Sequence, residues 1–351
     1  MLGTRKRWGA VVAAGGITLG AVIGSAGIAG ATASVTTQRL AGPDRYGTAA
    51  AVASNEFPNG ATISIIASGV NYPDALAAAY LSGRLHGPVL LTDPNNLTST
   101  TLNELKTMGS TGVDIVGGPS AVSDSVAGQL KNAGYQVNRI FGSDRYGTAQ
   151  AIATLFDKSF VANLGTGGPT AILATGLNFA DALAAGPLSY GQSLPILLTD
   201  PNSLPSSTQQ ALQSLGIKQV VLMGGTAAVS DAVVTQLQSM GITVMRVAGS
   251  DRTQTAAALA DNVEYGILNW PQTEANLARG DFYADALACG PLGGTLRTPV
   301  VLTLDPNNLG SSTGAFLTEH NGTINAIDVC GGPSAVSDGT VAAAQAAATS
   351  H

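Results

Sequence analysis

The sequence predicts an α/β protein of three tandem units, each a small parallel sheet covered by helices on both faces. One phrase occurs three times, about a hundred residues apart: RLAGPDRYGTAAAVA from Arg39, RIFGSDRYGTAQAIA from Arg139 and RVAGSDRTQTAAALA from Arg246. Within each copy, continuous apolar runs alternate with short amphipathic segments. That alternation is typical of parallel strands buried between helices, and the repetition predicts that the arrangement is built three times.

Three further phrases keep the register of the repeat. The first contains D-A-L-A, the second is an apolar run that ends in T-D-P or T-L-D-P, and the third contains G-G-x-x-A-V-S-D. Their recurring residues are Asp74, Asp181 and Asp285; Leu90, Leu91, Ile196, Leu197 and Leu198; Gly117, Gly118, Gly224, Gly225, Gly331 and Gly332; and Ser123, Ser230 and Ser337. We therefore expect units at residues 34–136, 137–243 and 244–351.

The second copy shows the order of the elements within a unit. The predicted elements are a strand at 136–140, a helix at 145–156 with Asp144 as its N-cap, a strand at 170–176, a helix at 179–191, a strand at 195–200, a helix at 206–216, a strand at 219–225 and a helix at 230–241. This order predicts a doubly wound, Rossmann- or flavodoxin-like sheet. Because the strand after each last helix opens the next unit, neighbouring units should be joined. The final helix, near 341–348, should lack a successor strand.

The segment at 1–33 differs from the repeats. Arg5, Lys6 and Arg7 precede an uncharged run from Trp8 to Gly30, and residues 31–33 read A-T-A. This pattern is typical of a cleaved secretory signal peptide. The alternative is an uncleaved membrane anchor, since the apolar run is long enough to span a bilayer. The glycines and the A-x-A ending favour cleavage, which leaves an exported protein without a membrane segment.

Charge argues against nucleic acid as a partner. Charged residues make up 11% of the 351 residues, against about 25% in typical soluble domains. Loss of the segment at 1–33 moves the net charge from -6 to -9, since it removes three cations and no anion. Proteins that bind nucleic acid are more often basic.

The motifs R-x-x-G-x-D-R-Y-x-T-A, D-A-L-A and G-G-x-x-A-V-S follow one another in this order along each copy. By these motifs, about residues 35 to 348 resemble the type 2 cell-wall-binding repeat, found in secreted and surface-layer proteins of Gram-positive bacteria. The resemblance implies a pseudo-threefold assembly of three units, bound non-covalently to an anionic wall polymer. It also links an I-L-L motif, matched at residues 89–91, 196–198 and 300–302, to wall attachment. From the residues alone, these three segments are buried central strands.

Recurring charges allow two interpretations. Asp74, Asp181 and Asp285 each have an arginine at an equivalent place: Arg45, Arg145 and Arg252. A charge among small apolar residues is costly unless it is paired, so an ion pair such as Arg45 with Asp74 would join two helices of one unit. Alternatively, these arginines, or Arg39, Arg139 and Arg246, hold a ligand oxyanion, because a guanidinium can donate two parallel hydrogen bonds to it.

Other features also carry alternatives. The serines of the G-G-x-x-A-V-S-D phrase read as N-caps, although such helix starts can also bind anions. Cys289 and Cys330 form either a disulfide or two buried thiols. The third copy diverges, with Thr253 and Gln254 in place of Tyr46 and Gly47, and it either binds differently or closes the assembly.

The sequence predicts a non-catalytic protein that attaches to the cell wall, with an anionic polymer or a peptidoglycan-associated glycan as its partner and with neither cofactor nor metal. The alternatives are an exported hydrolase of wall polymers and a self-assembling surface-layer subunit. The enzyme hypothesis lacks sequence support: His86, His320 and His351 share no position in the repeat, and neither a G-x-S-x-G elbow nor a zinc-spaced Cys/His cluster occurs.

Overall fold

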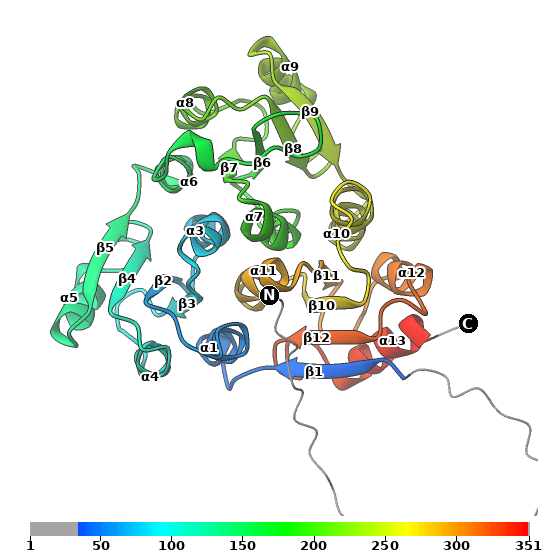
Figure 1. Ribbon diagram of the computed structural model, residues 1–351, viewed down its shortest axis with the longest axis horizontal. Coiled ribbons are helices and arrows are strands. Elements are labelled where there is room, and N and C mark those ends of the chain that lie inside the picture. Colours follow the sequence, from blue (N-terminus) through cyan, green and yellow to red (C-terminus); the bar gives the residue numbers. More distant parts are fainter. Residues whose placement is uncertain (1–33, 350–351) are drawn as a thin grey trace, which may run out of the picture. The chain divides into compact units, whose positions relative to one another are not determined.

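The computed structural model describes residues 34–349 and contains three four-stranded parallel sheets (Figure 1). The predicted signal peptide and His351 lie outside the described residues. Within residues 34–349, none of the helices has the length and apolar character needed to cross a membrane.

Each sheet takes four strands in the same spatial order. The first sheet is β3 (Val89–Thr92), β2 (Ile63–Ser68), β4 (Gly112–Val116) and β5 (Gln136–Ile140); the second is β7 (Ile196–Thr199), β6 (Thr170–Thr175), β8 (Gln219–Met223) and β9 (Thr243–Val247); the third is β11 (Val300–Thr303), β10 (Glu274–Arg279), β12 (Ala326–Cys330) and β1 (Thr36–Leu40). Every pairing within these sheets is parallel. The predicted doubly wound α/β fold is confirmed, with a flavodoxin-like strand order.

Helices occupy equivalent places in the three copies. The first helices of the copies are α1 (Arg45–Glu56), α6 (Arg145–Ala153) and α10 (Arg252–Leu259); η1 (Lys158–Phe160) comes after α6, and α10 continues into the π-helix η3 (Ala260–Tyr265). The second place is taken by α2 (Pro73–Leu76) with α3 (Ala78–Leu85), by η2 (Leu183–Ala185) with α7 (Gly186–Gln192), and by α11 (Ala284–Leu296). The third helices are α4 (Ser99–Thr107), α8 (Ser206–Ser214) and α12 (Ser311–Glu319), and the fourth are α5 (Asp124–Asn132), α9 (Asp231–Ser239) and α13 (Asp338–Thr349). The helix predicted at 145–156 ends earlier, at Ala153, and the one predicted at 179–191 begins only as the short η2.

The strands that join neighbouring units behave as predicted. β5 and β9 pair with β4 and β8 of the preceding sheet, and the limits predicted at 136/137 and 243/244 fall inside β5 and β9. As predicted, no strand follows α13 within residues 34–349, but the third sheet still has a fourth strand. β1, from the other end of the sequence, pairs with β12 in the place that β5 and β9 take elsewhere (Figure 1). The third sheet is therefore completed by the first strand, which closes the series of units.

The strands that carry the I-L-L-like residues are not central. β3, β7 and β11 each lie at one end of the strand order, yet all their residues are buried. Helices cover these edges: α1 packs on β3, α6 on β7 and α10 on β11. Leu90, Leu91 and Leu198 are thus core residues at edges that neighbouring helices protect.

One helix from each copy meets at the centre. α3, α7 and α11 pack on one another (Figure 1). Gly186 and Gly290 permit the close contact of α7 with α11, because a Cβ on Gly186 would lie 2.7 Å from the Cα of Gly290. The rings of Tyr72, Phe179 and Tyr283 also meet, with centroids 5.2–5.6 Å apart. The three copies therefore share one continuous apolar core.

Candidate ligand-binding site at the unit junctions

The strand order reverses between β2 and β4, so the carboxyl ends of these strands form the switch point at which ligands bind in open α/β sheets. Asp74 lies in α2, just after β2, and Gly117 follows β4. A Cβ on Gly117 would lie 2.8 Å from Oδ2 of Asp74, and Gly117 has a φ of 106°. Gly224 with Asp181 and Gly331 with Asp285 repeat this contact. Glycine is thus required at the first position of the G-G phrase, both because φ is positive there and because the aspartate lies too close for a side chain.

The Gly117→Ala variant is expected to have a free energy of unfolding about 1–3 kcal/mol lower than that of the parent protein, because alanine is strained at positive φ and its methyl group would meet Asp74. Gly128→Ala is the matched control. Gly128 lies in α5 with no atom within 4 Å of a built Cβ, so alanine there should stabilise by about 0.5–1 kcal/mol. Urea unfolding measures both changes, and equal effects would contradict this account of Gly117.

The first arginine of each copy binds backbone carbonyls in the strand-to-helix turn. Nη1 of Arg139 donates to the carbonyl oxygens of Gly117 and Val122 at 2.9 and 2.7 Å, and Nη2 lies 3.3 Å from Asp124. Arg39 and Arg246 repeat these contacts in the turns that follow β12 and β8. These interactions hold each turn against its neighbouring strand. A ligand contact by Arg39, Arg139 or Arg246 stays a prediction.

The second arginine of each copy donates a hydrogen bond to a backbone carbonyl of its own copy. Arg45, Arg145 and Arg252 donate to the carbonyl oxygens of Gly69, Gly176 and Gly280, respectively. The predicted ion pair within one unit is wrong: Asp74 interacts with Thr148 and Arg145 at the start of α6, not with Arg45. The physical reason is that α6 follows β5, and β5 lies in the same sheet as β2, the strand that precedes Asp74. The first helix of the next unit therefore begins beside this carboxylate.

The same carboxylate contact occurs at each joint. Asp181 interacts with Thr255 and Arg252, and Asp285 with Thr48, Arg279 and Arg45. Burial raises the pKa of Asp74 and Asp181 above their ordinary values, and it raises the pKa of Asp285 to about 6; the threonine and arginine contacts oppose these shifts. Each joint therefore holds a carboxyl group that takes up a proton more readily than a free aspartate.

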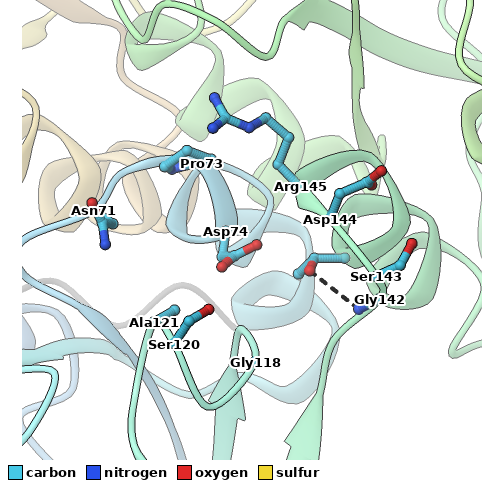
Figure 2. Close-up of a pocket in the computed structure, with 11 residues that line it drawn as sticks. Asn71, Pro73, Asp74, Gly118, Ser120, Ala121, Gly142, Ser143, Asp144 and Arg145 are labelled. Atoms are coloured by element: carbon cyan, nitrogen blue, oxygen red, sulfur yellow. Dashed lines mark hydrogen bonds between the residues drawn. The ribbon is translucent and has the colours of Figure 1, made fainter.

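A pocket of about 280 Å³ opens where the first sheet meets α6 (Figure 2). Its charged residues are Asp74 from α2 and Asp144 with Arg145 from the start of α6. Asp144 is the predicted N-cap and accepts a hydrogen bond from the Gly147 amide at 2.8 Å. The pocket thus presents a guanidinium and two carboxyl groups, one of them bound to a helix start, at the switch point of the sheet.

The joint between the third and first copies contains an aromatic ring. The ring of Phe282 lies 4.8 Å from Cζ of Arg45 and stacks on Tyr283 at 4.7 Å, while Arg279 approaches the same ring at 5.6 Å and pairs with Asp281. The first and second copies have Asn71 and Asn178 where the third has Phe282. The divergence of the third copy therefore places an aromatic ring next to the guanidinium of Arg45.

The predicted serine caps differ among the copies. The hydroxyl groups of Ser123 and Ser337 accept hydrogen bonds from the amides of Val126 and Thr340. Ser230 occupies the N-cap position of α9, but its buried hydroxyl makes no capping hydrogen bond.

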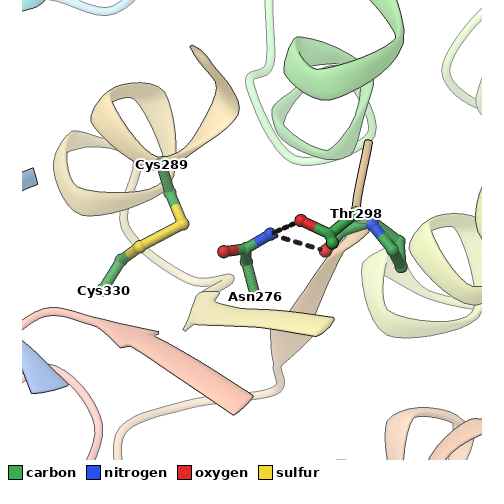
Figure 3. Close-up of a disulfide and its surroundings, with 5 residues drawn as sticks. Asn276, Cys289, Thr298 and Cys330 are labelled. Carbon is green, nitrogen blue, oxygen red and sulfur yellow. Dashed lines mark hydrogen bonds between the residues drawn. A yellow bond between two sulfur atoms is a disulfide. The ribbon is translucent and has the colours of Figure 1, made fainter. Parts of the chain in front are cut away.

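Cys289 in α11 and Cys330 at the end of β12 form a disulfide, with their Cα atoms 6.1 Å apart (Figure 3). Both cysteines are fully buried. Of the two interpretations left open by the sequence, the structure has the disulfide.

Sequence reasoning missed the threonines of the joints. Thr48, Thr148 and Thr255 accept hydrogen bonds from the amides of Gly42, Gly142 and Gly249 and also interact with the aspartates. Their recurrence three residues after each second arginine was the available signal. Among residues 34–349, no group of three or more His, Cys, Asp or Glu side chains is placed to hold a metal ion.

A family model described as cell wall binding domain 2 (CWB2) matches residues 39–127, 139–234 and 246–341. Among proteins of Bacillus subtilis (strain 168), the chain is 32% identical over 285 residues to N-acetylmuramoyl-L-alanine amidase LytC, covering 81% of this chain and 53% of that protein. It is also 32% identical over 254 residues to the amidase enhancer, covering 72% and 32%, respectively. The chain thus spans about half or less of the length of these relatives.

Two solved structures have the same fold. Cwp6 from Clostridium difficile superposes with a TM-score of 0.78 at 24% identity, covering 88% of this chain and 48% of that one. Cwp8 from the same organism gives 0.77 at 25% identity, covering 90% and 52%.

Proposed function

The chain belongs to the cell wall binding domain 2 (CWB2) family, and we propose that it attaches non-covalently to a bacterial cell wall by binding an anionic wall polymer through its three repeats. Export by the predicted signal peptide would bring it to the cell surface. The observation that carries the proposal is the pocket at the switch point, because it places Arg145 in an opening lined by residues from two copies.

Charge in this pocket is compatible with a weakly bound anion. Asp144 is engaged by the start of α6, and burial raises the pKa of Asp74, which lowers its negative charge at mildly acidic pH. Arg145 is left as the cation that pairs with a phosphate or carboxylate of the polymer. Each joint alone should bind weakly, but linked sites on one repeating polymer raise avidity by about 10² to 10⁴-fold.

Retention on cell walls tests the proposal. The triple variant Arg45→Gln/Arg145→Gln/Arg252→Gln keeps a hydrogen-bond donor at each joint but removes the charge. We expect its half-saturating concentration for sedimentation with purified Bacillus subtilis walls to rise by about 10²-fold, since several linked contacts weaken together. Retention of the parent protein should also fall with added salt, because exposed charges are screened.

The control removes three cations elsewhere. Lys106, Lys131 and Lys218 are exposed and lie outside the pocket at the joint, so Lys106→Gln/Lys131→Gln/Lys218→Gln should bind almost as the parent does. Equal losses in the two triple variants would make net charge, rather than the joints, responsible. A parent protein that stays in solution with walls would contradict attachment itself.

The second candidate is an exported hydrolase, favoured by the relative that is named an amidase. The same incubation separates the two: attachment predicts sedimentation without release of sugar or peptide, whereas a hydrolase predicts release. A surface-layer subunit would instead assemble in the absence of walls.

A further inference from the structure

A second groove adjoins the pocket at the joint and differs from it in chemistry. It has a volume of about 420 Å³ between α6 and α8, and it shares Gly142 and Ser143 with the pocket that contains Arg145. The loop of these two residues thus borders both openings. A chain-like ligand seated at Arg145 would continue over this loop into the groove.

The groove is lined by uncharged residues. Gln150 and Thr154 come from α6 or its end, Ser206, Ser207 and Gln210 come from α8, and one aromatic residue, Phe141, completes it. Gln150 donates a hydrogen bond to Gln210 at 3.2 Å. Amide and hydroxyl groups beside an aromatic ring are suited to a sugar, since a pyranose has hydroxyl groups at its edge and C–H groups on its faces.

Phe141 is exposed at the border of the two openings. Its side chain is 48% exposed, which makes it one of five large exposed hydrophobic residues in the described part of the chain. A Cβ on Gly118, which lines the pocket, would lie 3.3 Å from its ring. About half of this aromatic side chain is therefore open to a ligand beside the groove.

The groove's two most distinctive residues belong to the second copy alone. Where this copy has Phe141, the first and third have Ala41 and Ala248. Where it has Gln150, they have Ala50 and Ala257. The fold therefore accommodates alanine at both positions, and neither residue is needed to build the repeat.

We propose that an uncharged pyranose ring of a wall glycan stacks on Phe141, with its hydroxyl groups bonded to Gln150 and the other polar residues of the groove. This inference rests on the proposed wall attachment and deepens it. The second copy then selects the sugar of the ligand, while the joint selects its charge.

The variants are Phe141→Ala and Gln150→Ala, each of which installs the residue of the other copies. Phe160→Ala is the matched control, since Phe160 is 46% exposed and lies outside both openings. Half-saturating concentrations are measured by sedimentation with Bacillus subtilis walls at low and high salt. Walls treated with hydrofluoric acid, which removes phosphodiester-linked polymers, form a second arm.

Phe141→Ala is expected to raise the half-saturating concentration about tenfold, which corresponds to about 1.4 kcal/mol, and Gln150→Ala to raise it less. Because stacking is not screened by salt, the ratio to the parent should persist at high salt, whereas Phe160→Ala should bind as the parent does. If Phe141→Ala still binds treated walls more weakly than the parent does, the sugar belongs to peptidoglycan. If the difference between the two proteins disappears on treated walls, the sugar belongs to the removed polymer. Both results support a sugar site.

A parent protein that binds walls, together with an unchanged Phe141→Ala variant, would overturn the sugar site and leave wall attachment intact. Equal losses in Phe141→Ala and Phe160→Ala would also overturn it. The converse variant Ala248→Phe adds a ring at the equivalent place in the third copy. It should bind as tightly as the parent or more tightly, and weaker binding with unchanged thermal stability would count against stacking.

Discussion

At pH 7.5, the Asp285→Asn variant is expected to be more stable to urea than the parent protein, by up to about 3 kcal/mol. Folding raises the pKa of Asp285 from 3.8 to about 6, chiefly through burial. The folded protein therefore binds this proton more tightly than the unfolded chain, and each unit of pKa corresponds to about 1.4 kcal/mol. The stabilisation from the proton is present in full below about pH 3.8 and is lost as the pH rises through 6. Asparagine has no charge to bury at any of these pH values.

The gain should therefore depend on pH. It is expected to shrink as the pH falls from 7.5 towards 4, because the parent's Asp285 becomes protonated. Asp231→Asn provides the control: Asp231 pairs with Arg246 at the surface with 78% of its side chain exposed, so its removal should cost less than about 1 kcal/mol. If the parent protein were as stable as Asp285→Asn at pH 7.5, and the two did not differ at any pH tested, burial of the charged Asp285 would not destabilise the folded protein.

The fold was largely predictable because its signals are local and occur three times. Apolar runs marked strands such as β7, and Asp144 marked the start of α6. The position of β1 could not be read locally. Its sequence is equivalent to that of β5 and β9, but nothing near Arg39 tells which sheet it joins; only the pairing with β12, at the opposite end of the repeats, decides this.

The candidate site was predictable in its residue types but not in its partners. Recurrence identified Arg45 and Asp74 as important, and the cost of burying charge required that they be paired. The partner of Asp74 depended on which helix begins beside it, and that is set by strand exchange between units. Phe141 carried a sequence signal as well, an aromatic ring where two other copies have alanine. Because Phe141 differs from its counterparts Ala41 and Ala248, it is not part of the repeated motifs.

Removing the disulfide is expected to have the largest effect on stability. Cys289 and Cys330 are 41 residues apart in sequence, and cross-linking a loop of that length lowers the entropy of the unfolded chain by an amount worth about 4 kcal/mol at 25 °C. We therefore expect Cys289→Ala/Cys330→Ala to unfold at a clearly lower urea concentration. The bond ties the central helix α11 to β12, the strand that pairs with β1 (Figure 3). The loss should thus fall on the sheet that closes the series of units.

Reducing the parent protein distinguishes the effect of the disulfide bond on stability from the effect of removing its two buried sulfur atoms. Because both cysteines are fully buried, dithiothreitol should reach the bond mainly when the chain opens. The parent protein equilibrated in urea with reductant should therefore approach the midpoint of the double alanine variant, and that variant should not respond. Hydrogen exchange gives the location: amides of β1 and β12 should lose more protection in the variant than those of β4 and β5, which form the equivalent pair in the first sheet. A loss of protection spread evenly over both pairs would show that the bond stabilises the whole protein without a particular role in joining its first strand to its last sheet.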